Sequence, residues 1–148
     1  MITCDNRHDR VEYCFQCSAY PCQRFAAPSD TDSFISYRNV IADLERARVG
    51  GIEAYRAKLD ERVDILEFLI ANCNDGRRKG MFCLAANLLS LDDLRAVTER
   101  IRQADAVAGA ADALARGATV EARAALAVAL IEERATRANV ELRLRRKG

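Results

Sequence analysis

The sequence is poor in the residues that mark several common classes of protein. It has one histidine, 2 prolines and 7 glycines among 148 residues, and its basic and acidic side chains nearly balance, for a formal net charge of +1. A near-neutral charge argues against a strongly electrostatic binder of nucleic acid or of membranes. We therefore expect neither a nucleic acid nor a lipid surface as the partner.

Long hydrophobic runs are also missing. No window approaches the roughly 18 continuous apolar residues of a membrane span, and the first residues are polar, unlike a signal peptide. These patterns predict a cytoplasmic protein with no membrane segment. Thiols stay reduced in that compartment, so clustered cysteines there indicate metal or redox chemistry rather than disulfides.

Catalytic motifs are scarce. A serine–histidine–aspartate triad would have to use His8, and the G-x-S-x-G motif is absent. The basic run at 77–79 precedes a predicted helix and could hold an anion there, but it lacks the spacing of a P-loop. We interpret it as a basic turn that Asn74 and Asp75 cap locally. The sequence therefore favours a non-enzymatic protein over an enzyme.

What the sequence has in quantity is helix-forming residues. Hydrophobic residues make up 50% and charged residues 30% of the chain, which is ordinary for a folded protein with a core. Alanine, arginine, leucine and glutamate dominate after residue 31. We predict a mainly α, single-domain helical bundle over 1–148, in which 1–30 form a cysteine-rich, zinc-knuckle-like head and 31–148 form the bundle.

The spacing of apolar residues places the helices. It predicts helices over about 33–49, 52–72, 81–89, 91–103 and 119–138, and a weaker alanine-rich helix over 104–116. Gly50-Gly51 should end the first helix and Asn139 the last. In the extended tail that follows, apolar residues at 140, 142 and 144 alternate with charged ones. Asp32 or Ser33 should cap the first helix and Ser90 the fourth. The helix over 52–72 should be the most buried. One face is formed by Leu59, Val63, Leu66, Ile70 and Cys73, and is widened by Ile65, Phe68 and Leu69.

The densest chemical signal is a group of four cysteines in the first 22 residues, namely Cys4, Cys14, Cys17 and Cys22. The C-x2-C spacing of Cys14 and Cys17 lets both sulfurs face one ion while backbone amides turn toward them. Pro21 stiffens the backbone before Cys22, which lowers the entropy lost when the site closes. The sequence therefore predicts a closed tetrahedral zinc site made of four thiolates.

Other assignments of the cysteines stay open. His8 could replace one thiolate, and the same thiolates suit an iron–sulfur cluster. Cys14 and Cys17 could instead act as a redox dithiol, although no strand precedes them. A metal-free chain is a further alternative. Cys73 and Cys83 are expected to be core thiols, with a mutual disulfide or a role as metal ligand as their alternatives.

The segment 12–25 carries a family resemblance. Its run of Tyr13, Cys14, Cys17, Tyr20, Pro21 and Cys22 resembles the cysteine-rich family labelled "domain of unknown function 3795", and the segments 74–79 and 82–89 resemble a subgroup of it. The similarity covers about 4–100, and the family's usual N-terminal cysteine block is not found in this sequence. The resemblance implies a zinc-binding protein without an assigned activity.

These observations together predict a structurally zinc-stabilised, non-enzymatic module that acts through a protein partner or as a homo-oligomer. One alternative is a redox or electron-transfer protein that uses an iron–sulfur centre or the Cys14/Cys17 dithiol. The other is a metal-free helical interaction protein.

Overall fold

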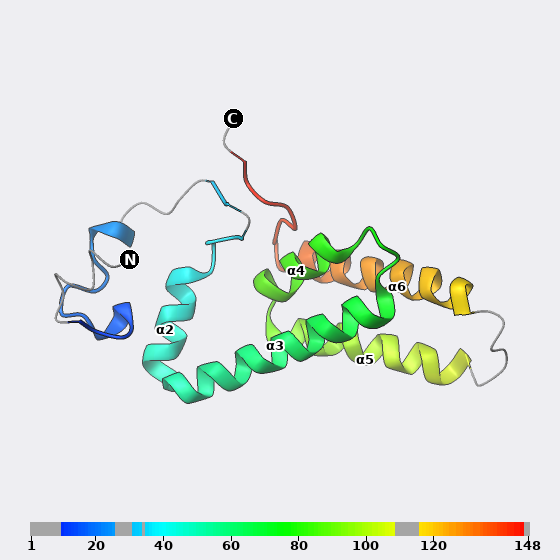
Figure 1. Cartoon of the computed structure of the whole chain (residues 1–148), viewed down its shortest axis with the longest axis horizontal. Helices are drawn as coiled ribbons and strands as arrows, with labels where there is room; N and C mark the ends of the chain where they lie inside the picture. The colour runs from blue at the N-terminus through cyan, green and yellow to red at the C-terminus, as the bar shows by residue number, and fades with distance from the viewer. Residues whose placement is uncertain (1–9, 26–30, 34, 109–115, 147–148) are drawn as a thin grey trace. The chain divides into compact units, whose positions relative to one another are not determined.

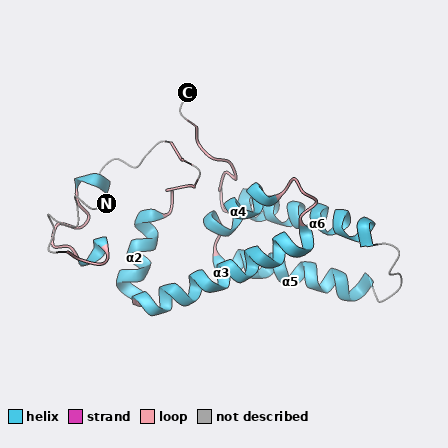
Figure 2. Ribbon diagram, viewed as in Figure 1, coloured by secondary structure: helices cyan, strands magenta, loops and turns pink. Residues whose placement is uncertain are grey.

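The protein is mainly helical, as predicted. A computed structural model describes residues 10–25, 31–33, 35–108 and 116–146. These residues form five α-helices and two short 3-10 helices, with no strand among them (Figures 1 and 2). Within the same residues, no helix is long and apolar enough to cross a membrane.

The chain divides into two compact units. We call Met1–Ala57 with Arg145–Gly148 the N-terminal unit, and Lys58–Leu144 the core unit. The boundary between them falls inside helix α3 (Ile52–Cys73). The prediction of a single domain stays a prediction.

The N-terminal unit contains the 3-10 helices η1 (Cys14–Gln16) and η2 (Gln23–Phe25) and the helix α2 (Val40–Gly50). The predicted helix start at residue 33 is wrong, because α2 begins only at Val40. Asp32 does not cap a helix. Its carboxylate accepts hydrogen bonds from the Ser36 hydroxyl (3.2 Å) and from the backbone N–H of Arg145 (2.9 Å). The helix ends as predicted, at Gly51, whose φ of +86° favours glycine.

Helix α3 has the predicted bounds, but only part of its predicted face is buried. Its buried side chains are Ile65, Leu69 and Cys73, spaced four residues apart, whereas Leu59 and Val63 are exposed. The prediction that this helix is the most buried is also wrong. In α4 (Lys79–Leu88), four of 10 residues are buried, namely Phe82, Ala85, Ala86 and Leu88, against three of 22 in α3.

Local polar chemistry fixes the ends of α4 and α5 (Leu91–Ala108). The Arg62 guanidinium donates to the carbonyl oxygens of Ala86 (2.7 Å) and Leu89 (2.8 Å) at the end of α4. As predicted, Ser90 caps α5, since its Oγ accepts from the backbone N–H of Asp93 at 3.1 Å. The same hydroxyl lies 2.6 Å from the Asp93 carboxylate, to which it donates.

Helices α5 and α6 (Arg116–Arg137) pack side by side in the core unit (Figure 1). The predicted break after residue 103 is wrong, because α5 continues to Ala108. Alanine is the strongest helix former, so this alanine-rich stretch extends the helix. Residues 109–115 of the predicted weaker helix lie outside the described residues. The last helix begins at Arg116, earlier than the predicted residue 119.

The core of this unit is a single apolar cluster. Its buried members come from α3 to α6 and are Ile65, Leu69, Cys73, Phe82, Ala85, Leu89, Leu94, Val97, Ile101, Ala127, Ile131 and Ala135. Asn139, with a φ of +52°, ends α6 as predicted. The tail then alternates as predicted, because Val140 and Leu142 pack against the cluster while Glu141 and Arg143 are exposed.

Candidate functional site

The cysteine segment of the N-terminal unit holds three of the predicted metal ligands, Cys14, Cys17 and Cys22. The fourth ligand, Cys4, and its alternative His8 lie outside the described residues. The backbone N–H of Cys17 bonds to the carbonyl oxygen of Cys14 at 3.1 Å, so the C-x2-C spacing forms one tight turn. The Gln16 side chain closes this turn by accepting from the backbone N–H of Tyr13 at 2.9 Å.

The sulfur atoms in this segment differ in their surroundings. Cys14 is exposed, whereas Cys17 and Cys22 are half-buried, and no disulfide links them. The backbone N–H of Ala19 donates to Cys17 Sγ at 3.4 Å. An amide hydrogen bond of this kind stabilises a thiolate and orients it toward a metal.

Aromatic contacts hold the segment together. The rings of Tyr13 and Phe15 stack at 5.4 Å between centroids, and those of Tyr20 and Phe25 meet edge-on at 5.9 Å. The Tyr13 hydroxyl accepts from Arg56 in α3 at 2.6 Å. These contacts fix the segment within its own unit by packing and hydrogen bonding.

The charge of Glu45 in α2 acts on Tyr20 of this segment. Burial raises the pKa of Tyr20, and the nearby Glu45 carboxylate raises this pKa further. Arg48 donates to Glu45 at 2.7 Å and, together with Tyr20, holds the pKa of Glu45 below its ordinary value. The Tyr20 ring is therefore held beside a carboxylate that stays charged at neutral pH.

The described residues do not by themselves complete a metal site. Among them, no group of three or more histidine, cysteine, aspartate or glutamate side chains is placed to hold a metal ion. The zinc site predicted at Cys4, Cys14, Cys17 and Cys22 stays a prediction, since one of its four ligands lies outside the described residues.

The two downstream cysteines behave differently from each other. Cys73 is 0% exposed, as predicted for a core thiol, and burial, with a smaller contribution from the charge of Asp105, raises its pKa to about 11. The prediction that Cys83 is also buried is wrong, because it is exposed on α4. The apolar residues Phe82, Ala85 and Ala86 turn inward, which leaves Cys83 on the outer side of the helix.

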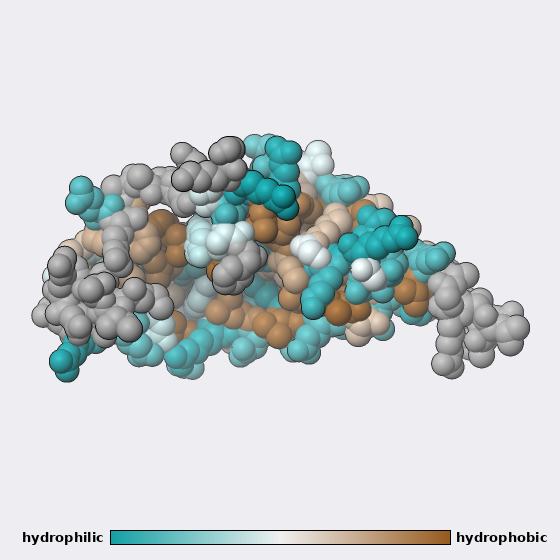
Figure 3. Space-filling view, turned by 45° about the horizontal axis from the view of Figure 1, so that its top comes forward, coloured by the Kyte–Doolittle hydropathy of each residue, from teal (hydrophilic) through white to brown (hydrophobic). Residues whose placement is uncertain are grey.

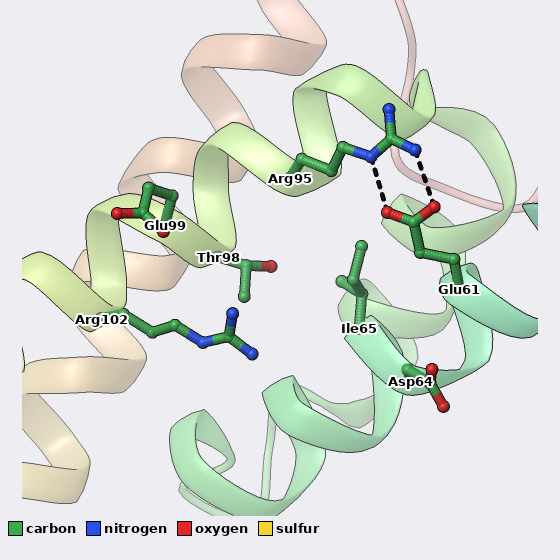
Figure 4. Close-up of a pocket in the computed structure, with 7 residues that line it drawn as sticks. All are labelled: Glu61, Asp64, Ile65, Arg95, Thr98, Glu99 and Arg102. Carbon is green, nitrogen blue, oxygen red and sulfur yellow. Dashed lines mark hydrogen bonds and ion pairs between the residues drawn. The ribbon is translucent and has the colours of Figure 1, made fainter.

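A charged pocket of about 360 Å³ lies between α3 and α5 (Figure 4). At one end, Arg95 donates to both carboxylate oxygens of Glu61 at 2.6 and 2.7 Å. At the other, Arg102 lies 5.0 Å from the centre of the Phe68 ring. The lining side chains include no cysteine, serine or histidine, and its best-placed charges neutralise each other, so the pocket resembles a polar seam between helices.

No pattern in the sequence predicts this pocket. Glu61 and Arg95 are 34 positions apart and belong to no motif, so only the packing of α3 against α5 brings them together. By contrast, the basic turn at 74–79 matches its local interpretation. The Asn74 side chain accepts from the backbone N–H of Gly76 (3.1 Å) and of Arg78 (3.2 Å).

Comparisons with protein-family models, with curated proteins and with solved structures gave no match to this chain. The resemblance seen at the cysteine run therefore stays a prediction, and the function has to be argued from the chain itself.

Proposed function

We propose that this protein is a non-enzymatic protein-interaction module whose N-terminal unit is stabilised by zinc. Cys14, Cys17 and Cys22 would be three ligands and Cys4 the fourth, with His8 as the alternative to Cys4. The observation that carries the proposal is the amide of Ala19, directed at Cys17 Sγ from 3.4 Å. Such a bond offsets the negative charge that a thiolate keeps when it binds a metal.

The build of the N-terminal unit supports a structural role for the metal. Ala47 is the only buried apolar residue among its described residues, so apolar packing contributes little to its stability. Small units of this kind are commonly stabilised by a metal, whose binding free energy adds directly to that of folding. When bound, zinc would cross-link the cysteine segment and would take no part in a reaction.

Metal analysis of protein purified anaerobically without added zinc tests the proposal. We expect about one zinc per chain in the native protein and in a Cys83→Ser control, whose cysteine lies in the other unit. A Cys17→Ser variant should lose most of the metal. Less than about a tenth of an equivalent in the native protein would contradict the proposal, because structural zinc is bound tightly.

The same preparation distinguishes the alternatives. Visible absorbance together with iron in the metal analysis would indicate an iron–sulfur centre instead. A second candidate, a metal-free interaction module, is favoured by the two aromatic pairs, which hold the cysteine segment without a metal. An unchanged melting temperature in chelator would select this candidate over the zinc-stabilised one.

A further inference from the structure

Helix α3 carries an apolar strip that the core unit leaves partly uncovered. Leu59 is 40% and Val63 51% exposed, one helical turn apart. Leu66 and Ile70 continue the line in steps of three and four residues and are half-buried. Figure 3 shows hydrophobic residues reaching the surface of the molecule among hydrophilic ones. We call these four residues the α3 strip.

The α3 strip borders the face that α3 turns to the core, and its member Leu66 packs against the core cluster. Successive residues of an α-helix are rotated by about 100°, which places Cys73, Leu69 and Ile65 roughly 80°, 120° and 160° around the helix from Val63. Ile65, Leu69 and Cys73 are the buried residues of this helix. The helix is therefore apolar over more of its circumference than its contacts in the core unit use.

One edge of the α3 strip is acidic. Glu67, Asp60 and Asp64 lie about 40°, 60° and 100° from Val63, on the side away from the core face. No ion pair engages these three carboxylates in the described part of the chain, whereas Glu61 is paired with Arg95. Figure 4 shows the Asp64 carboxylate pointing away from that pair.

The opposite edge offers little compensating charge. Arg62 lies there, but its guanidinium is committed to the carbonyl oxygens of Ala86 and Leu89. Arg56, one turn before Asp60, is paired with Glu53 at 3.0 Å. The surface beside the α3 strip thus combines exposed aliphatic side chains with three carboxylates that no ion pair engages in the described part of the chain. A partner complementary to both features needs apolar residues on one face and cations along its border.

We propose that the α3 strip and its acidic edge dock an amphipathic helix of another protein. The partner would present aliphatic residues at i, i+4 and i+7, flanked by lysine or arginine, and would pack along α3 as helices do in a groove. The inference rests on the interaction part of the proposed function and does not depend on zinc. A second copy of α3 is a poorer occupant, since antiparallel pairing would set its acidic edge against the same edge.

The test uses the full-length protein and a defined probe. The probe is a synthetic helical peptide of leucine, alanine and lysine, with leucines at i, i+4, i+7 and i+11 and lysines beside them. The control peptide has glutamate in place of every lysine. We expect calorimetry to detect binding of the cationic peptide only, and amide NMR shifts to be confined to residues near 59–70.

Charge reversal distinguishes binding at the α3 strip from non-specific electrostatic attraction of the peptide. Asp60→Lys with Glu67→Lys should weaken the cationic peptide at least tenfold and allow the anionic peptide to bind. The matched control, Glu121→Lys with Glu132→Lys, changes the net charge equally at exposed positions of α6 and should have little effect. Val63→Ser, at an exposed position, should also weaken binding about tenfold without unfolding the chain.

Three results would overturn the inference. They are equal weakening by both charge-reversed variants, no binding of the cationic peptide, and self-association that Val63→Ser abolishes, which would make a second copy the occupant. Each titration is repeated in chelator and with added zinc. Peptide binding by a protein that takes up no zinc even when zinc is added would contradict the proposed metal alone. A zinc-loaded protein that does not bind the peptide would contradict the docking site alone.

Discussion

At the scale of single residues, two cysteines ten positions apart illustrate how strongly environment controls chemistry. Cys73 is sealed in the apolar cluster, and its pKa is raised to about 11 by burial. At neutral pH only about one thiol in 10,000 would then be ionised, and the thiolate is the reactive form. Cys83 is exposed and has no such protection.

We therefore predict selective modification of the native protein. Iodoacetamide at neutral pH should label Cys83 to completion while Cys73 stays unlabelled, and both should react after denaturation. Peptide mapping by mass spectrometry measures the two rates in one sample, so the denatured protein is the internal control. Equal rates in the native protein would show that the cluster around Cys73 opens readily.

Asp32 connects Arg145, near the end of the chain, to the rest of the N-terminal unit. Its side chain is 0% exposed and lies 3.7 Å from Arg38 and 3.6 Å from the Arg145 guanidinium. Burial alone would raise the pKa of Asp32. The N–H groups of Arg145 and Tyr37, the Ser36 hydroxyl and the Arg145 charge outweigh burial and hold this pKa below its ordinary value of 3.8.

Because the pKa of Asp32 is lower in the folded state, the contribution of its carboxylate to stability decreases at acidic pH. It is fully present above the ordinary value of 3.8 and is lost as the pH falls through the lower value of the folded state. We predict that Asp32→Asn costs about 1.5–3 kcal/mol at neutral pH, as for a lost hydrogen-bonded charge, and less in acid.

Hydrogen exchange of the Arg145 amide measures this loss, because that N–H donates to Asp32. Asp43→Asn is the control. It removes a partly exposed ion pair with Arg46 and should cost less than about 1 kcal/mol. Equal effects of the two variants would mean that Asp32 is no more than a surface charge.

At the scale of elements, the end of α4 depends on a side chain from α3. Arg62→Met keeps the aliphatic length of the side chain but removes both hydrogen bonds to the carbonyl oxygens of Ala86 and Leu89. We predict a loss of about 2–3 kcal/mol in the free energy of unfolding, because carbonyl groups at a buried helix end are left unsatisfied.

Urea unfolding provides the measurement, with Arg95→Met as the matched control. Arg95 pairs with Glu61 at the surface, where even a bidentate ion pair contributes about 1 kcal/mol or less. A smaller loss for Arg62→Met than for Arg95→Met would contradict the role of Arg62 at the end of α4.

The elements also show which features a sequence can predict. Ser90, Gly51 and Asn139 end or begin helices through contacts within a few residues, so local patterns predicted them correctly. The start of α2 was missed because Asp32 bonds to Arg145, 113 positions away.

At the candidate site, too, local contacts could be predicted from the sequence, whereas contacts that depend on tertiary packing could not. Which flank of α3 is buried depends on how α4 and α5 pack against Ile65 and Leu69, so the exposure of Val63 could not be read from spacing alone. The tight turn from Cys14 to Cys17 agrees with the C-x2-C pattern. The pocket beside Glu61 and the exposure of Cys83 depended on tertiary packing that the sequence does not encode locally.

At the scale of the whole molecule, the two units rely on different sources of stability. The core unit buries one continuous apolar cluster drawn from four helices. The described part of the N-terminal unit buries one apolar residue, Ala47, and relies instead on aromatic pairs, on the contacts of Asp32 and, in our proposal, on zinc. A loss of apolar volume should therefore be most costly in the core unit.

Leu69→Ala tests this difference. Leu69 is 0% exposed at the centre of the cluster, so truncation removes buried methyl groups and leaves a cavity. The expected loss is about 2–5 kcal/mol, seen as faster hydrogen exchange throughout α4, α5 and α6. Leu59→Ala is the matched control, since the same atoms are removed from a side chain that is 40% exposed, and it should cost about 1 kcal/mol or less. A comparable acceleration of hydrogen exchange by the two variants would show that Leu59 is packed in the core. It would also contradict the proposal that the α3 strip is free to bind a partner.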